Sequence, residues 1–370
     1  MSRTLTLKKT PGKPGQVYYP LELSTKPVPK PGPGQLLVKI HAAALNHRDF
    51  FQRQALYPGL SFDHPILADG FGTVVALGPD VSPAAAKLLH QPVVLTPSRG
   101  WARDLAGPEQ IAKFSVIGGA ALYPDGTAQD YIAVPEDEVE ASPSHLSPAE
   151  AAALPLVGVT GWRALVTKCG LSPSGAQGRN ILVTGIGGGV ALQVLQFAVA
   201  MGCNVYVTSG SADKIDRAVK LGARGGVSYR SKTWDKDLLK QLPKDRPFLD
   251  AVVDGAGGDI VGRASRLLKP GGIISCYGMT TSPRMDWVMQ AVLKNVELRG
   301  STMGSRGEFR DMVAFVREKK ITPIVSRTVK GLDNLAEIDG LFEDIKEGKQ
   351  FGKLVIEISE PGADKVAAKL

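Results

Sequence analysis

The sequence predicts an α/β protein with two domains, a compact, partly open β-barrel and a doubly wound parallel sheet. Three observations support this prediction. The chain of 370 residues is long enough for two or three domains. The stretch before Ser147 contains short β-branched runs bounded by Gly or Pro, which are typical of a small barrel. From Asn180 onward, apolar strand-like runs alternate with helical stretches, as in a parallel sheet with crossover helices.

The first domain is expected to consist of short strands separated by turn residues. These strands lie within residues 31–46, 70–78, 91–97 and 126–135. A helix over 307–320 and a strand over 351–358 come late in the chain, and we expect both to return to the first domain. The predicted domains are therefore residues 1–152 with 303–370, and residues 153–302.

The pattern changes near Ser147. Ser147 is a candidate N-cap, followed by Pro148 at the first helical position and Glu150 at the third, which predicts the start of a helix. The expected strands of the second domain are 180–185, 204–209, 249–257, 273–278 and 296–302. The expected helices between them are 190–201, 211–222, 260–272 and 283–295. This alternation predicts right-handed crossovers onto a parallel sheet.

The composition is typical of a globular protein and argues against several classes. Hydrophobic residues make up 43% and charged residues 22% of the chain, and no apolar stretch approaches the length of a membrane span. The first residues lack the apolar core of a signal peptide, so we expect a cytoplasmic protein with no membrane partner.

The net charge of +8 is dispersed and no nucleic-acid-binding motif is present, so nucleic acid is not an expected partner. Cys169, Cys203 and Cys276 form no C-x-x-C pair, which favours packing roles over a disulfide or zinc site.

A glycine turn joins the first strand of the second domain to its first helix. Its spacing is G-x-x-G-x-x-A, through Gly185, Gly188 and Ala191. A small residue at Gly185 permits the tight turn, and Gly188 and Gly189 let backbone N–H groups approach a pyrophosphate. Ala191 is small enough for the helix to pack on the strand, and Gly202 is expected to end that helix. At this position in a run of βα units, the turn predicts a dinucleotide site.

The end of the second strand distinguishes between two cofactors. A site for NAD usually has an Asp or Glu there, which accepts a hydrogen bond from the ribose 2′-OH. Here Thr208, Ser209, Gly210 and Ser211 occupy that place, and Lys214 follows. Hydroxyl and ammonium donors suit a 2′-phosphate, so we expect NADP(H). Two plainer interpretations stay open: Ser211 acts as a helix cap, and Lys214 belongs to a solvated helix face.

With these residues in view, the chain resembles the medium-chain dehydrogenase/reductase superfamily, and within it the zinc-free quinone oxidoreductase branch. The resemblance extends from about Leu36 to Glu357 and rests on the order of several motifs. They are "LLVKIHAAALNHRDFF", "PILADGFGTVVALG", "DGTAQDYIAVP", "AAALPLVGVTGWRAL", the glycine turn, "VVDGAGG", "LLKPGG" and "FGKLVIEI". It implies a GroES-like catalytic domain with a partly open β-barrel, and a Rossmann domain that binds the cofactor.

The resemblance also implies which residues contact the cofactor. Thr160 is expected near the nicotinamide ribose, and Val190 at the pyrophosphate with Gly188 and Gly189. Tyr229 joins Lys214 at the 2′-phosphate, although it is equally compatible with a half-buried strand aromatic. The loops that flank the nicotinamide are expected to contain Gly278, Met279, Met303 and Gly304.

The chain departs from the zinc-dependent alcohol dehydrogenases of that superfamily at the metal ligands. Those enzymes have Cys where Asn46 stands, and Gly-His-Glu where Ala68-Asp69-Gly70 stands. A catalytic zinc ion needs about three protein ligands. Asn46 and Asp69 do not make a convincing set, even with His47 or His64 added. The cysteine-rich lobe that holds a structural zinc is also replaced, so we expect no metal.

Without zinc, the chain lacks a Lewis acid that would lower the pKa of an alcohol. We therefore expect hydride transfer to a small electrophile, a quinone or an α,β-unsaturated carbonyl. Asn46 is a candidate donor to a carbonyl oxygen or to the nicotinamide ribose. Arg48 is a candidate electrostatic stabiliser or a salt-bridge partner of Asp49. Tyr57 is a candidate proton donor or pocket residue, and His47 a candidate pyrophosphate ligand.

Two other functions stay open from the residues alone. One is an enoyl-thioester (enoyl-CoA or acyl-carrier) reductase of lipid or polyketide metabolism. The other is an NADP-binding structural or RNA-associated protein, which the basic charge permits.

The C-terminal Ala368-Lys369-Leu370 is a conservative variant of the S-K-L address, so the peroxisome is an alternative to the cytoplasm. We also expect a homodimer.

Overall fold

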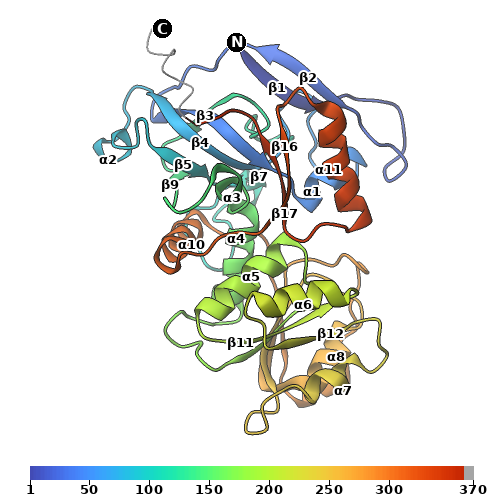
Figure 1. The fold of residues 1–370 in the computed structure, drawn as a ribbon. Helices are drawn as coiled ribbons and strands as arrows, with labels where there is room; N and C mark the ends of the chain where they lie inside the picture. Colours follow the sequence, from blue (N-terminus) through green and yellow to red (C-terminus); the bar gives the residue numbers. More distant parts are fainter. Residues whose placement is uncertain (362–370) are drawn as a thin grey trace. The chain divides into compact units, whose positions relative to one another are not determined.

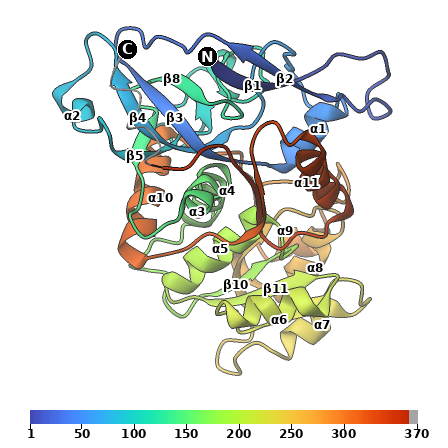
Figure 2. The same ribbon diagram turned by 45° about the horizontal axis from the view of Figure 1, so that its top comes forward.

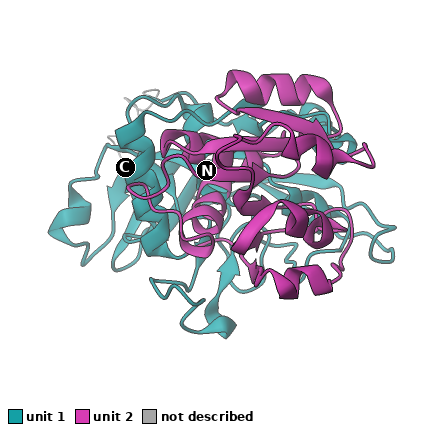
Figure 3. Cartoon of the chain, turned by 90° about the horizontal axis from the view of Figure 1, so that it is seen from below, with its two compact units in different colours: residues 1–156, 305–370 teal, residues 157–304 magenta. Residues whose placement is uncertain are grey.

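The computed structural model describes residues 1–361, which belong to two compact units (Figure 3). Unit 1 comprises Met1–Leu156 and the described residues from Ser305 onward, and unit 2 comprises Val157–Gly304. Ala368-Lys369-Leu370 lies outside the described residues, so its role as an address stays a prediction. Within residues 1–361, no helix has the length and apolar character needed to cross a membrane.

Unit 1 contains a seven-stranded sheet with the order β16-β17-β3-β4-β5-β9, and β8 also pairs with β3 (Figure 1). Its strands are β3 (Gln35–Ala44), β4 (Asp69–Leu77), β5 (Pro92–Leu95), β8 (Tyr131–Pro135), β9 (Val139–Ala141), β16 (Val325–Lys330) and β17 (Lys353–Glu357). The long, apolar β3 pairs antiparallel with β4, β8 and β17. A strand from the end of the chain therefore lies beside one from its beginning.

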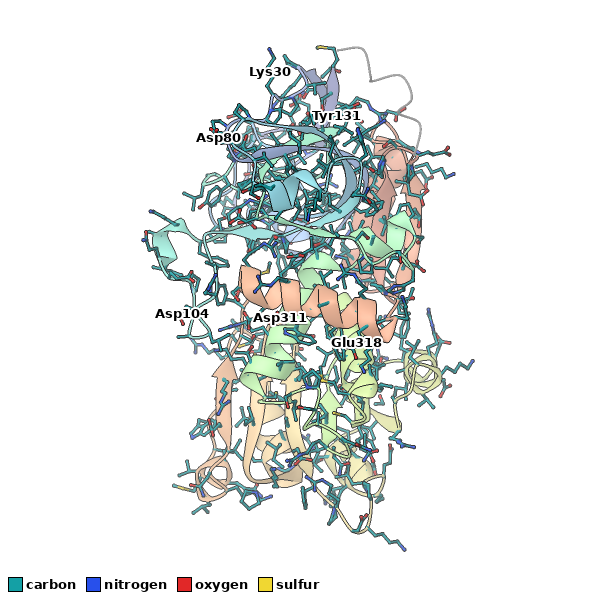
Figure 4. The ribbon with its side chains drawn as sticks, turned by 90° about the vertical axis from the view of Figure 1, so that its left-hand side faces the viewer. Lys30, Asp80, Asp104, Tyr131, Asp311 and Glu318 are labelled. Atoms are coloured by element: carbon teal, nitrogen blue, oxygen red, sulfur yellow. The ribbon has the colours of Figure 1, made fainter. Side chains whose placement is uncertain are left out.

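The remaining elements of unit 1 cover and extend this sheet. They include β1 (Ser2–Leu7), β2 (Leu21–Lys26), α1 (His47–Arg53), α2 (Pro83–Ala86), α3 (Pro148–Ala152), α10 (Arg306–Lys319) and α11 (Leu335–Glu347). Buried side chains of β1, β3, β17 and α11 share one hydrophobic core. Asp311 and Glu318 mark the exposed side of α10 (Figure 4). The sequence patterns predicted α10 but not the β1–β2 pair or α11.

A single carboxylate ties the loop that follows β6 (Ser98–Arg99) and precedes β7 (Ser115–Val116). Glu109 accepts hydrogen bonds from the backbone N–H groups of Ala102, Arg103 and Asp104 at 2.7–3.0 Å. These bonds lower the pKa of Glu109 to about 2. Asp104 lies on the exposed part of this loop (Figure 4). The segment that replaces the cysteine-rich lobe is thus held together by a carboxylate.

The predicted helix start at Ser147 is confirmed. The Ser147 hydroxyl accepts from the Glu150 N–H, and the Glu150 carboxylate accepts from the Ser147 N–H, which together form a capping box. Helix α3 is short, and α4 (Pro155–Trp162) begins at the next proline. The chain then continues into a π-helical segment over Arg163–Lys168.

Unit 2 contains a six-stranded, all-parallel sheet with the order β12-β11-β10-β13-β14-β15. Figure 2 labels its strands β10 and β11. Its strands are β10 (Asn180–Val183), β11 (Asn204–Ser209), β12 (Gly225–Ser228), β13 (Leu249–Asp254), β14 (Leu268–Cys276) and β15 (Glu297–Gly300). Its helices are α5 (Gly189–Ala200), α6 (Ala212–Lys220), α7 (Trp234–Leu239), α8 (Ile260–Leu267) and α9 (Met289–Leu293). This order is that of a Rossmann fold, so the predicted fold class is confirmed.

Two predicted helices are too long. The helix expected over 260–272 ends at Leu267, because Leu268 is already extended and begins β14. Pro270 could not have continued a helix in any case. The helix expected over 283–295 is only α9, which starts at Met289 after an extended N-cap residue, Val288.

Candidate functional site

The carboxyl edge of the unit 2 sheet is where a ligand is expected. Strand β10 lies between β11 and β13, so the connections from these strands diverge to opposite sides of the sheet. In open α/β sheets, ligands bind at the crevice that such a divergence leaves beyond the strand ends. The glycine turn follows β10 at this place, and the "DGAGG" loop follows β13.

The glycine turn has the geometry that a pyrophosphate needs. Gly185 and Gly187 have φ values of 64° and 125°, which favour glycine. Gly188 is the N-cap of α5, and having no side chain it leaves the first-turn N–H groups available to an anion. Residues 189–191 open the helix, as expected. Gly202 follows the helix with a φ of 80°, which confirms it as the helix stop.

The end of β11 brings together the residues predicted for the 2′-phosphate. A Cβ atom at Gly187 would lie 2.9 Å from Lys214 Cδ, so the Lys214 stem lies over the glycine turn. A Cβ atom at Gly210 would lie 2.6 Å from the Tyr229 hydroxyl and 3.0 Å from Arg230 Nε. The backbone at Gly210 therefore forms a cradle with a phenol and a guanidinium beside it, and a larger side chain there would displace them. Arg230 was not among the predicted residues.

Two details of this cradle bear on the alternatives for Ser211 and Lys214. Ser211 is the N-cap of α6, yet in the described part of the chain its hydroxyl makes no capping bond. The Ser209 hydroxyl instead accepts from the Ser211 N–H at 3.2 Å. Burial and the neighbouring Arg217 lower the pKa of Lys214, with burial the larger cause. Lys214 is thus a partly buried cation over the turn rather than part of a fully solvated face.

The residues predicted to flank the nicotinamide fall into two groups within unit 2. The Thr160 hydroxyl lies 3.8 Å from Met303 Sδ, and both residues are buried. Gly304 follows Met303, whose φ is 44°. Gly278 and Met279 lie in the loop after β14, where a Cβ at Gly257 would lie 3.1 Å from the side chain of Met279.

The sequence patterns missed Asp254 and Thr184, which hold the loops at the strand divergence. Asp254 is fully buried, accepts from the Thr184 hydroxyl at 2.6 Å and accepts from the Gly257 N–H at 2.8 Å. Burial raises the pKa of Asp254. Asp254 is within the quoted "VVDGAGG" motif, so a buried acid at a strand end was a signal that could have identified it.

In unit 1, Asn46 belongs to a closed polar network. Its Nδ2 donates to Asp69 Oδ2 at 2.8 Å, and its Oδ1 accepts from Lys353 Nζ at 2.5 Å. Lys353 Nζ also donates to Asp69 Oδ2 at 2.8 Å and to the Leu45 carbonyl at 2.5 Å. The three hydrogens of the ammonium group thus have three oxygen acceptors.

The strand register explains why these side chains converge. Ala44 at the end of β3 pairs with Asp69 at the start of β4 and with Val355 in β17. Lys353 begins β17, and its side chain therefore reaches the residues that follow β3. Asp69 Oδ1 also accepts from the Leu156 N–H at 2.7 Å. The exposed fractions of the Lys353 and Asp69 side chains are 4% and 0%.

These residues do not fit a zinc ion. A zinc site needs about three Cys, His or carboxylate ligands with lone pairs aimed at one point. Here an amide and one carboxylate are hydrogen-bonded to a lysine ammonium, whose charge would repel a second cation. Across residues 1–361, no group of three or more His, Cys, Asp and Glu side chains is placed to hold a metal.

The remaining predicted residues of unit 1 lie on or near α1. Arg48 Nη1 pairs with Asp49 Oδ1 at 3.0 Å. Arg48 therefore forms the salt bridge that was one of its two predicted roles. The Arg48 guanidinium carbon lies 4.7 Å from the ring centroid of Tyr57. His47 is exposed and packs edge-on against Phe51. Asp49 also caps α1 by accepting from the Asn46 N–H at 2.7 Å.

Comparison with known proteins gives matches along almost the whole chain. The model of the alcohol dehydrogenase GroES-like domain matches residues 32–144, and that of the zinc-binding dehydrogenase matches residues 189–318. A zinc-type alcohol dehydrogenase-like protein, YogA, from Leptosphaeria maculans is 60% identical, with 97% of this chain and 100% of that protein covered.

Two solved structures share the fold and 30% identity. One is an NAD-dependent alcohol dehydrogenase with a TM-score of 0.81, covering 96% of this chain and 100% of that one. The other is a putative alcohol dehydrogenase from Sinorhizobium meliloti with a TM-score of 0.82, covering 96% and 98%. These descriptions apply to those two proteins, and neither specifies a substrate for this chain.

The Lys353 network yields a stability prediction. Lys353→Met leaves the buried Asp69 carboxylate without its cation, so the free energy of unfolding should fall by about 3–5 kcal/mol in chemical denaturation. Lys353→Met/Asp69→Asn should recover part of that loss, because no charge is then left unpaired. The control is Lys349→Met at an exposed lysine, which should change the value by less than about 0.5 kcal/mol. A Lys353→Met variant as stable as the parent protein would contradict the network.

Proposed function

The chain belongs to the medium-chain dehydrogenase/reductase superfamily, and on that premise we propose that it is an NADPH-dependent, metal-free reductase. Its proposed substrates are small electrophiles, either quinones or α,β-unsaturated carbonyl compounds. The observation that carries the proposal is the Lys353 ammonium bonded to Asn46 and Asp69. Asn46 and Asp69 stand where zinc-dependent members have metal ligands, and Lys353 binds both of them.

The contacts of Lys353 bear on which reaction is favoured, because some reactions need a Lewis acid and others do not. Oxidation of a simple alcohol requires stabilisation of an alkoxide, which zinc provides in the zinc enzymes. The Lys353 ammonium has its three hydrogens on protein oxygens, so it does not take over that role for a substrate oxygen. An electron-poor acceptor has no such requirement, which favours quinones and enones.

The cofactor proposal rests on the cradle at the end of β11. Ser209, Ser211, Lys214, Tyr229 and Arg230 offer hydroxyl, ammonium and guanidinium donors suited to a 2′-phosphate. The first turn of α5 would hold the pyrophosphate. Thr160 of α4 and the loops with Met303 and Gly278 would hold the nicotinamide. When bound, NADPH supplies a hydride to the electrophilic carbon.

Asn46 has one further hydrogen available for a substrate. Its amide nitrogen carries two hydrogens, and the bond to Asp69 uses one. The network fixes the orientation of the amide, because Lys353 and Asp69 bind its two ends. We propose that the second hydrogen donates to the carbonyl oxygen where negative charge develops. Tyr57 as a proton donor and His47 as a pyrophosphate ligand stay predictions.

A homodimer is the proposed assembly. Strand β15 is the edge of its sheet, and the neighbouring helix α9 exposes Met289 and Leu293 at 69% and 76%. An antiparallel pairing of two β15 strands about Leu298 would place Glu297 of each copy opposite Arg299 of the other. Self-complementary charges on an open, partly apolar edge favour a second copy of this chain as the partner.

The cofactor proposal predicts a selective effect of Lys214→Ala. The loss of the ammonium should weaken NADPH binding about tenfold and leave NADH binding within about twofold, because only NADPH has the 2′-phosphate. Kd values from fluorescence titration would measure both. Lys220→Ala, on the exposed end of the same helix, is the matched control and should change neither. Equal weakening for both nucleotides would refute the assignment.

The substrate proposal predicts NADPH oxidation with some acceptors and not others. A quinone, a short enal and an enoyl-CoA should be compared at equal concentration by absorbance at the nicotinamide band. We expect turnover of the quinone or the enal. Turnover of the enoyl-CoA alone would favour a thioester reductase, and turnover of none would favour a binding protein without reductase activity.

The dimer proposal predicts monomers when the apolar edge is charged. Met289→Lys/Leu293→Lys should shift the mass in light scattering from two chains to one, because four buried ammonium groups would oppose association. Val219→Lys/Leu239→Lys makes the same change at exposed apolar positions of α6 and α7 and should leave the mass at two chains. A dimer that survives the α9 changes would place the interface elsewhere.

A further inference from the structure

The guanidinium of Arg48 has one edge occupied and one edge without a partner. Nη1 lies 3.0–3.1 Å from Asp49 Oδ1 and from the carbonyls of Ile117 and Gly118. Nε and Nη2 are buried and have no hydrogen-bond partner among the described residues. The exposed fraction of the Arg48 side chain is 7%. Buried donors without acceptors are rare in native proteins, and each one requires an explanation.

The unoccupied edge has the form of a carboxylate receptor. Nε and Nη2 point their N–H groups in parallel from one edge of the planar guanidinium, which matches the two oxygens of a carboxylate. The three acceptors on Nη1 hold the plane in a fixed orientation, and the Tyr57 ring covers its face at 4.7 Å. A rigid fork of this kind recognises a planar two-oxygen anion better than a single carbonyl oxygen.

The surrounding charges permit an anion here. Asp49 is the carboxylate that pairs with Arg48, but its Oδ1 is on Arg48 Nη1 and its Oδ2 is on the Asn46 N–H. Both oxygens are therefore engaged away from the unoccupied edge. Asp69 is paired with Lys353, so the two carboxylates are each matched by a cation. Asp49 contacts both Arg48 Nη1 and the Asn46 N–H, so the guanidinium belongs to the same helix start as the proposed carbonyl donor.

We propose that Arg48 binds a carboxylate of the substrate through Nε and Nη2, so that the preferred substrates are enones with a carboxylate near the reducible double bond. This inference rests on the proposed function, which it narrows to one substrate class. Entry to the fork requires the turn with Tyr57 to shift, since both nitrogens are buried. Ala55 and Gly59, on either side of Tyr57, have φ values of 56° and 68°.

The test compares two acceptors that differ in one group, 4-oxopent-2-enoate and 4-oxopent-2-enamide, with NADPH. The parent protein should have a kcat/KM at least tenfold higher for the carboxylate, although the amide is the more activated enone. Arg48→Lys keeps the positive charge but has no fork, and it should bring the ratio close to one. A ratio near one in the parent protein, or an unchanged ratio in Arg48→Lys, would overturn the inference and would point to a water molecule on the fork.

A second variant and a binding experiment separate the inference from the proposed function. Arg48→Met/Asp49→Asn removes both members of the ion pair, so a folded variant without carboxylate preference would support the inference if Arg48→Lys fails to fold. Binding of 4-oxopentanoate and 4-oxopentanamide, which lack the double bond, can be measured by calorimetry with NADP⁺ present. Arg48-dependent binding of the acid without turnover of any enone would support the carboxylate site and contradict the reductase. Turnover of the enamide, with no preference that depends on Arg48, would support the reductase and contradict the carboxylate site.

Discussion

The ion pair between Lys353 and Asp69 is the constraint on which unit 1 depends. It joins the end of β3, the start of β4, the start of β17 and the N–H of Leu156 at the beginning of α4. Both side chains are buried, so the pair is stable only while every donor and acceptor in it is satisfied. That requirement fixes the orientation of Asn46, the residue proposed to face the substrate carbonyl.

The same pair connects the fold to the chemistry that the protein is proposed to perform. A lysine ammonium supplies a positive charge among the positions that correspond to metal ligands in zinc-dependent relatives, but its hydrogens are used internally. On this proposal, the network holds the site together without offering a Lewis acid to the substrate. In unit 2 the binding elements are independent of this network, since the glycine turn and the cradle at Gly210 use backbone geometry and cationic side chains.

Much of the fold was predictable because its signals are local. The capping box at Ser147, the glycine turn and the run of βα units each depend on neighbouring residues, and the structure has all three. The contribution of Lys353 was not predictable, because it arises from the pairing of strands about 300 residues apart in the chain. In the quoted motif "FGKLVIEI" it reads as an ordinary lysine at the start of a strand. Arg230 was missed for a related reason, since its proximity to Gly210 depends on the pairing of β12 with β11.

The most direct test of the central claim, that a lysine ammonium replaces the catalytic metal, is the zinc content of the protein. The purified chain should be equilibrated with excess Zn²⁺, passed over a desalting column and measured by inductively coupled plasma mass spectrometry. We expect far less than one zinc ion per chain, because the ammonium group and its three acceptors leave no set of ligands. One zinc ion per chain, lost in Asn46→Ala or Asp69→Ala, would contradict the account.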